Sequence, residues 1–172
     1  MTISMYDASA PCFVSMLRSL DAILGKAQAH AAAKKIDPPA LLAARLFPDM
    51  LTFVRQIQIA SDHAKGAVGR LAGVELPKYE DNEQTFDELK ARIAKTIAFI
   101  ESIKPAQING SEERVIALKV GGKDMSFKGL PYLVGFALPN FYFHLVTAYN
   151  ILRHNGIEIG KRDYLPPPPS MT

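Results

Sequence analysis

The sequence predicts an all-α fold: a bundle of four helices with a short β-hairpin inserted before the last helix. Three observations support this prediction. Apolar residues recur at spacings of three and four in three separate segments, as they do on amphipathic helices. The period changes around Gly121-Gly122, in a segment rich in β-branched residues. Residues 129–152 contain no Asp, Glu, Lys or Arg. Because the chain has 172 residues, we expect residues 1–165 to form one domain.

The first three helices are recognised by their apolar stripes and their ends. Pro48 suits the start of the second helix and Gly73 its end. Thr85 and Glu88 have the spacing of a capping box at the start of the third helix. The apolar stripe of the first helix consists of Phe13, Met16, Leu17, Leu20, Ile23 and Leu24.

The segment at about residues 113–128 predicts a β-hairpin. β-Branched residues flank Gly121-Gly122, a pair that suits a two-residue hairpin turn. The pair is no phosphate-binding loop, because neither the Lys-Ser/Thr signature nor a strand-to-helix setting follows it. A single hairpin does not fold alone, so we interpret it as an insertion in the helical domain.

Residues 139–155 predict the last helix, which is apolar on nearly every side and ends at Gly156. We expect it to be the buried helix around which the others pack. A membrane span is disfavoured because Pro131, Gly135 and Pro139 interrupt the apolar run. One stripe is nevertheless polar, at spacings of four, three, three and four: Asn140, His144, Thr147, Asn150 and His154. This stripe either faces a polar cleft or forms a hydrogen-bonded seam between helices.

Composition narrows the class of protein. The net charge of +3 is small and the charges are scattered, which disfavours nucleic-acid binding. Cys12 is the only cysteine, so no internal disulfide forms. The first residues lack the features of a signal peptide, and we expect a cytoplasmic protein. Residues 166–172 are rich in proline, and we expect a disordered tail.

Four segments together resemble a bacterial family of uncharacterised proteins, a domain of unknown function grouped with the DinB/YfiT-like four-helix bundles. The most specific is the string NFYFH, followed by LRHNG and GKRD. The resemblance covers nearly the whole chain and implies a DinB-like bundle that is often a homodimer. The segments are FPDM (47–50), RQIQIASD (55–62), RLAGVELP (70–77) and LPNFYFHLVTAYNILRHNGIEIGKRDYL (138–165).

The resemblance also implies a metal site. Many DinB-like proteins hold a divalent metal, such as zinc or nickel, on three histidines. One histidine comes from the second helix, and two come from the last helix in a His-x-x-x-His pattern. In this sequence the corresponding residues are His63, Asn150 and His154. Asn150 stands where a histidine is expected, and an amide is a poor ligand for zinc or nickel.

A second group of polar residues predicts a site for a small molecule. Asn140 and His144 lie four apart on the last helix, and Asp62 or His63 could face them from the second. This set suits a metal with few protein ligands or general acid–base chemistry. The ligand-binding candidates are Asp62, Asn140, His144, Tyr149 and Arg153. The alternative is a non-catalytic, dimeric helical protein whose polar stripe is structural, and the residues do not specify a reaction.

Overall fold

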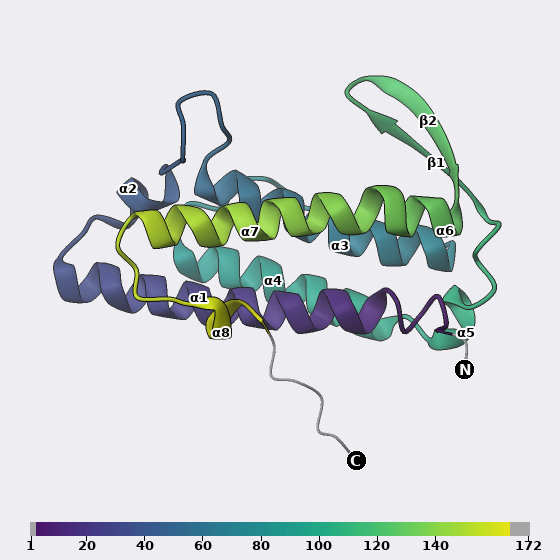
Figure 1. Ribbon diagram of the computed structural model, residues 1–172, viewed down its shortest axis with the longest axis horizontal. Helices are drawn as coiled ribbons and strands as arrows, with labels where there is room; N and C mark the ends of the chain where they lie inside the picture. Colours follow the sequence, from purple (N-terminus) through teal and green to yellow (C-terminus); the bar gives the residue numbers. More distant parts are fainter. Residues whose placement is uncertain (1–2, 166–172) are drawn as a thin grey trace, which may run out of the picture.

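The computed structural model describes residues 3–165, in which four long helices lie side by side (Figure 1). The predicted fold class, an all-α bundle with a β-hairpin before the last helix, is confirmed. The predicted disordered tail lies outside the described residues. The long helices are α1 (Ala10–Lys34), α3 (Phe53–Ala72), α4 (Phe86–Ser102) and α7 (Leu138–His154). The shorter helices are α2 (Pro38–Leu42), α5 (Pro105–Ile108), α6 (Gly129–Tyr132) and α8 (Lys161–Tyr164).

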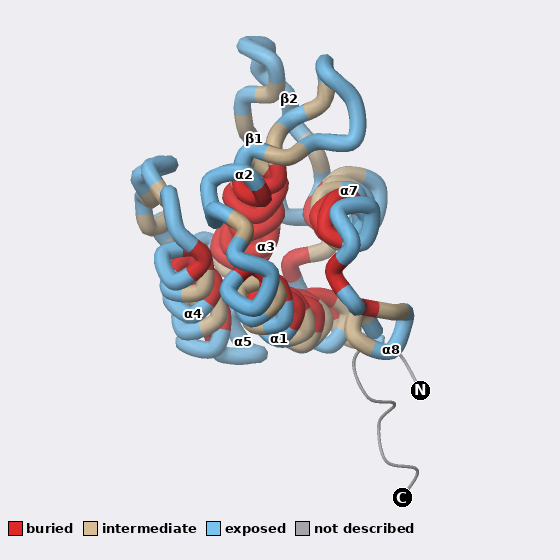
Figure 2. The backbone as a smooth tube through the Cα atoms, turned by 90° about the vertical axis from the view of Figure 1, so that its left-hand side faces the viewer, coloured by how far each residue is buried: buried red, intermediate tan, exposed pale blue. Residues whose placement is uncertain are grey.

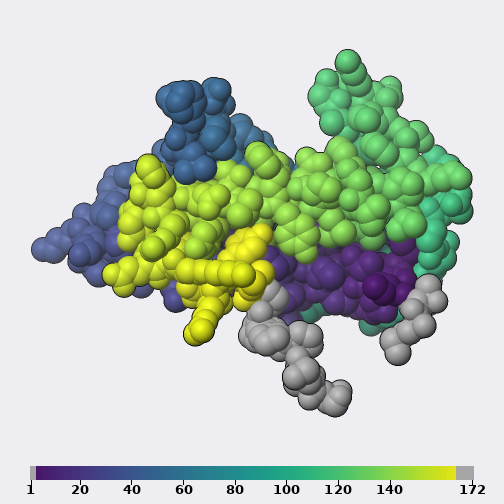
Figure 3. All heavy atoms as spheres, in the orientation of Figure 1, coloured from purple at the N-terminus to yellow at the C-terminus, as the bar shows by residue number. Residues whose placement is uncertain are grey.

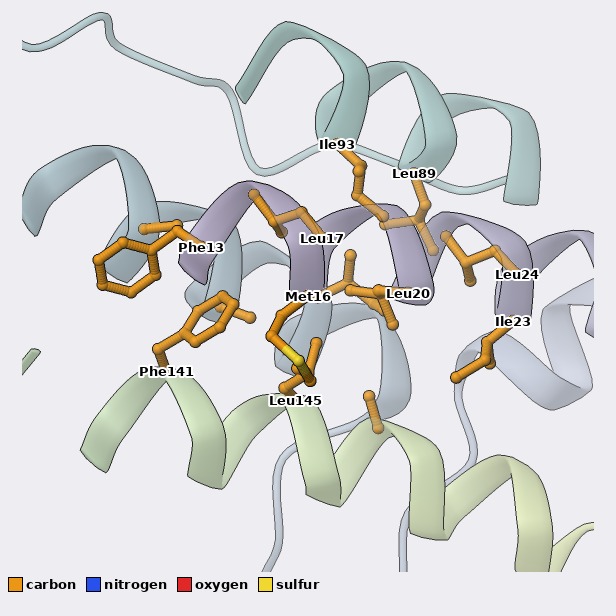
Figure 4. Packing of buried hydrophobic residues seen from close by; sticks show 14 of the residues in the cluster. Phe13, Met16, Leu17, Leu20, Ile23, Leu24, Leu89, Ile93, Phe141 and Leu145 are labelled. Atoms are coloured by element: carbon orange, nitrogen blue, oxygen red, sulfur yellow. The ribbon is translucent and has the colours of Figure 1, made fainter. Parts of the chain in front are cut away.

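The core lies where the four long helices face one another, and the buried residues gather there in the end view of Figure 2. Apolar residues of α1 meet Leu89 and Ile93 of α4 on one side, and Phe141 and Leu145 of α7 on the other (Figure 4). The rings of Phe13 and Phe141 meet edge to face, with centroids 4.9 Å apart. Burying each such side chain contributes about 1.5–3 kcal/mol, so this core supplies the main force that holds the helices together.

The most buried helix is α3, and the prediction that the last helix holds this place is wrong. Thirteen of the 20 residues of α3 are buried, whereas α7 buries six of 17. Tyr142, Phe143 and Val146 are exposed, and Phe143 has 56% of its surface open. The other helices cover only one side of α7, so its remaining apolar residues face outward.

Local signals locate several helix ends but not the start of α3. The predicted capping box is present at α4, where the Glu88 N–H donates to Thr85 Oγ1 and the Thr85 N–H donates to Glu88 Oε2. Gly73 ends α3 with a φ of +70°. The second long helix begins at Phe53 rather than at the predicted Pro48, because Pro48 lies in a turn.

The last helix begins earlier than predicted. Helix α6, the π-helical turn η1 (Leu133–Ala137) and α7 follow one another without a gap. Pro139 has no N–H to donate to the preceding turn. The Leu138 N–H reaches back five residues to the Leu133 carbonyl, and Asn140 Nδ2 donates to the Phe136 carbonyl at 2.7 Å. The extra residue in the turn accommodates the proline, so the helix widens instead of breaking.

The predicted hairpin consists of β1 (Val115–Val120) and β2 (Lys123–Lys128). Gly121 and Gly122 both have positive φ, as a type I′ turn requires. The Phe127 ring packs against Tyr132 and Phe136, with centroids 6.1 and 5.5 Å away, and anchors the hairpin over the start of the last helix. Within residues 3–165, no helix is both long and apolar enough to span a bilayer.

Candidate functional site

Polar and aromatic side chains form two facing rows where α3 packs against the last helix. The α3 row is Gln56, His63 and Arg70, at intervals of seven residues, which places them on one face of the helix. The opposite row, at intervals of four, is Tyr132, Phe136, Asn140 and His144. The two helices run in opposite directions (Figure 1), so the first residue of one row meets the last of the other. We call these seven residues the α3–α7 seam.

Two histidines meet at the centre of the seam. The rings of His63 and His144 are stacked, with centroids 5.8 Å apart and 16° between their planes. The Phe136 and His63 rings also meet edge to face, with centroids 5.8 Å apart. Residues 81 positions apart in the sequence are therefore in contact, and each comes from a regular helix that limits its movement.

His144 is held in one orientation by Gln56. His144 Nδ1 lies 2.7 Å from Gln56 Oε1, and Gln56 Nε2 donates to the Leu51 carbonyl at 3.2 Å. Because the amide nitrogen is the donor to Leu51, the amide oxygen accepts a hydrogen bond from His144. This network assigns the proton to Nδ1 of His144 and leaves the lone pair on Nε2.

Both histidines are neutral at pH 7. Burial is the main reason that the pKa of His63 falls to about 4, with a smaller contribution from His144. The nearby Asp62 raises this pKa and Arg70 lowers it further. Burial also lowers the pKa of His144. A neutral imidazole has one nitrogen that donates and one that accepts, so the pair can bind a polar ligand or receive a proton.

A cavity of about 350 Å³ opens beside His63. The hairpin forms one wall of the cavity and α3 another, and the start of the last helix contributes Phe136 and Asn140. Figure 3 shows the hairpin and the loop before α3 projecting from the same side of the molecule, with a depression between them. The lining residues are Ile59, Asp62, His63, Arg70, Phe136, Asn140 and residues 118–121.

A larger cavity, of about 670 Å³, lies elsewhere, between α1, α4 and α8. Its wall includes the ion pair of Arg18 with Glu101, at 2.6 Å. It also includes Asp163, which pairs at 2.6 Å with Lys26, a residue outside the cavity wall. No histidine lines it. The cavity at the seam is smaller, but it brings together the groups able to perform chemistry.

The structure brings some of the predicted site residues together and separates others. His63, Asn140 and His144 meet at the seam. Asp62 reaches the edge of the cavity, but it pairs with Lys65 and Arg92, at 2.9 and 3.0 Å, on the side of α3 that faces α4. The Tyr149 ring packs against Tyr164 of α8, 5.7 Å away, so this residue faces away from the seam.

The predicted metal set of His63, Asn150 and His154 does not converge. Asn150 and His154 are both exposed, as is the ligand candidate Arg153. His154 lies ten residues after His144, which is about 15 Å along a helix. His144, four residues after Asn140, is instead the member of the stripe that meets His63.

Sequence reasoning did not include Arg70, Tyr132 or Phe136 in the site. The intervals of seven on α3 and of four on the last helix are visible in the sequence. Such intervals identify a shared face, but they do not identify which helix that face meets. The pairing of the two rows depends on the antiparallel packing of α3 and α7.

The family described as a domain of unknown function (DUF1993) matches residues 5–165. The chain belongs to the DUF1993 family. A crystal structure of a DinB family member protein from Shewanella denitrificans is similar to it, with a TM-score of 0.87 and 41% sequence identity. The similarity covers 97% of this chain and 94% of that chain. The resemblance to a domain of unknown function among the DinB-like proteins is thus confirmed. None of the curated proteins matches the chain.

The seam of this DUF1993 protein does not fit a metal held by three histidines. At the seam, the residues with that arrangement, one from the second long helix and two at an interval of four on the last, are His63, Asn140 and His144 rather than the predicted His63, Asn150 and His154. Asn140 is a weak ligand for zinc or nickel, and its amide already donates to the Phe136 carbonyl. Among residues 3–165, no three His, Cys, Asp or Glu side chains are grouped to hold a metal.

Proposed function

We propose that this DUF1993 protein binds a small organic molecule in the cavity at the α3–α7 seam. The observation that carries the proposal is the unpaired state of His63. Within residues 3–165 its ring nitrogens have no hydrogen-bond partner, although the ring is partly buried and lines the cavity. These nitrogens are not fully buried, so they remain open to the cavity and can pair with a polar group that enters it.

The size and lining of the cavity support a small ligand. A volume of about 350 Å³ is near the lower end of the range of about 300–1,000 Å³ usual for ligand sites. Phe136 and His63 both contribute aromatic surface to the cavity wall, which suits a planar group. His63 supplies one donor and one acceptor at the cavity wall. The proposed function is therefore the binding of a small, flat, polar molecule.

The contrast within the histidine pair disfavours a purely structural seam. His144 is hydrogen-bonded to Gln56, as a structural residue would be. Within residues 3–165, His63 instead makes ring contacts with His144 and Phe136 and no hydrogen bond. If the seam only fixed how the helices pack, phenylalanine would serve as well as histidine at position 63.

An NMR screen of small aromatic compounds tests the proposal. We expect binders to shift the ring resonances of His63 and His144 and to leave those of the exposed His154 unchanged. His63→Phe keeps the stacked ring but removes both nitrogens, so it should fold normally and lose these binders. The matched control is His154→Phe. Compounds that bind His63→Phe as well as the unchanged protein would overturn the proposal.

We propose as a second candidate that two copies pair through the outer face of α7. Tyr142, Phe143 and Val146 are exposed on α7, and the Phe143 ring lies 5.3 Å from that of His144. Exposed apolar residues grouped in this way favour protein–protein contact. Light scattering should give the mass of a dimer, and Phe143→Glu should give a monomer, whereas Val115→Glu on the hairpin should remain dimeric. A monomeric unchanged protein would exclude this candidate.

A further inference from the structure

Arg70 is a cation on the wall of the seam cavity, and it has no acidic partner among residues 3–165. Its guanidinium is hydrogen-bonded through Nη1 to the Tyr132 hydroxyl at 3.1 Å. The carboxylate that shares the cavity wall, Asp62, is already paired with two other cations, Lys65 and Arg92. Arg70 is thus placed by a neutral partner and keeps its charge uncompensated.

A glycine makes room for this placement. The guanidinium of Arg70 folds back along α3 over Gly66, one turn earlier, where a Cβ atom would collide with Arg70 Nη1. Glycine weakens the interior of a helix relative to alanine, yet one occurs here, in the middle of α3. An alanine at this position would force the guanidinium to move away from its present place beside the cavity.

The charges around the cavity favour a negative ligand. Lys119 of β1 also lines the cavity, and its nearest acidic partner, Asp124, is 3.9 Å away at the exposed end of the hairpin. Asp62 is the acidic residue of the wall, and Lys65 and Arg92 neutralise it. Among residues 3–165, Arg70 is therefore the cation of the wall that no carboxylate pairs, and Lys119 adds a second positive charge that Asp124 only weakly balances.

We propose that the cavity binds a small organic oxyanion, whose carboxylate or phosphate group pairs with Arg70 while its flat part lies against Phe136 and His63. The guanidinium presents N–H groups in a planar fork that matches either oxyanion. This inference rests on the proposed function, since it names the class of ligand for the same cavity.

NMR titrations with benzoate, phenyl phosphate and neutral benzamide test the inference. The first two probes distinguish a carboxylate from a phosphate, and the third has the same ring without the charge. We expect at least one anion to shift the ring resonances of His63 and to bind about tenfold or more tightly than benzamide. Arg70→Gln should weaken that anion by about tenfold or more. The control Arg153→Gln, on the exposed end of α7, should not weaken it.

A bound anion should also raise the pKa of His63, because it offsets the positive charge of Arg70. Benzamide should leave this pKa unchanged. Gly66→Ala should weaken the anion in the same direction as Arg70→Gln, because it displaces the guanidinium.

Two results would overturn the inference. If benzamide and the anions bind equally and Arg70→Gln changes nothing, the cavity takes a ligand but not through its charge, and the proposed function survives alone. If neither anion shifts His63, the inference fails, and the wider screen of compounds on His63→Phe decides the proposed function separately.

Discussion

α3 carries polar side chains on two sides, and the two sides differ in how completely the protein pairs them. On the side facing α4, Arg92 of α4 is fully buried. It contacts Asp62 of α3, and Asp81 and Glu83 of the segment before α4, at 3.0, 3.1 and 3.0 Å. Its Nη1 and Nη2 also donate to the carbonyls of Glu80 and Gln58. On the side facing α7, His63 and Arg70 line a cavity, and neither forms an ion pair within the described residues 3–165. The first side is organised to hold the chain together, and the second leaves groups available to a ligand.

The α3–α4 side also holds down the connecting segment between these helices. Asp81 and Glu83 belong to this segment, and so does Tyr79, whose ring lies 3.6 Å from Lys65 Nζ and 4.1 Å from Lys95 Nζ. Among residues 3–165, Nε is the one Arg92 nitrogen left without a partner. Charged groups that are buried together in this way are costly to separate, so this side should be the more sensitive to mutation.

The largest effect should come from Arg92→Met. The change leaves the buried Glu83 and its neighbours Asp62 and Asp81 without their shared cation, and we expect the free energy of unfolding to fall by about 3–5 kcal/mol. Urea denaturation measures this. The control Arg18→Met breaks the ion pair with Glu101, whose side chains are 65% and 50% exposed, and should change the stability by less than about 1 kcal/mol. If both variants lost a similar amount of stability, the buried ion pairs of Arg92 would not matter more than the exposed ion pair of Arg18.

The next largest effect should be a pH dependence caused by His63. Its pKa is about 4 in the folded protein and 6.5 in the unfolded reference. Between these values the unfolded state binds the proton and the folded state does not. Stability should therefore fall as the pH decreases from about 6.5 to 4, by roughly 3 kcal/mol for a shift of this size.

His63→Phe isolates the contribution of His63 to the pH dependence of stability, because the variant keeps every other titrating residue. As the pH falls through this window, the variant should gain stability relative to the unchanged protein, by up to roughly 3 kcal/mol. A difference independent of pH would mean that His63 is not buried in its neutral form.

A smaller effect is expected for His144→Ala, which leaves the amide oxygen of Gln56 without its partner. An unpaired group of this kind costs about 1–3 kcal/mol. His63→Phe should cost less at pH 8, since His63 has no hydrogen bond to lose within residues 3–165 and the ring contacts persist. Thermal denaturation of the two variants compares them. Equal losses would show that both histidines are structural.

The smallest effect on the unliganded protein should come from Asn140→His, which loses one hydrogen bond to the Phe136 carbonyl, worth about 1 kcal/mol. This variant also tests metal binding. The change places a third imidazole beside His63 and His144, so protein purified without a histidine tag should gain zinc or nickel binding by calorimetry. Adding His63→Phe should abolish the gain. Equally tight binding by the unchanged protein would show that two imidazoles suffice.

Part of the candidate site could be predicted from the sequence. The helical period alone placed Asn140 and His144 on one face of the last helix. It also identified His63 as a residue that could face them from the second helix. Asp62, one residue earlier, was an equal candidate. Neighbouring residues point in different directions from a helix, but the sequence does not reveal which of the two directions faces α7. In the structure, Asp62 pairs with the buried Arg92 on the side of α3 that faces α4.

The sequence by itself determined the features that depend on neighbouring residues. These features include the capping box at Thr85, the two-glycine hairpin turn and the end of α3 at Gly73, because contacts within a few residues stabilise each of them. The helical period, which predicts the fold class, is also visible in the sequence alone. Only the tertiary structure decided which helix became the most buried, and which polar residues of α7 lie opposite α3. Those outcomes depend on the antiparallel register of two helices far apart in the chain, which packing of the whole core selects.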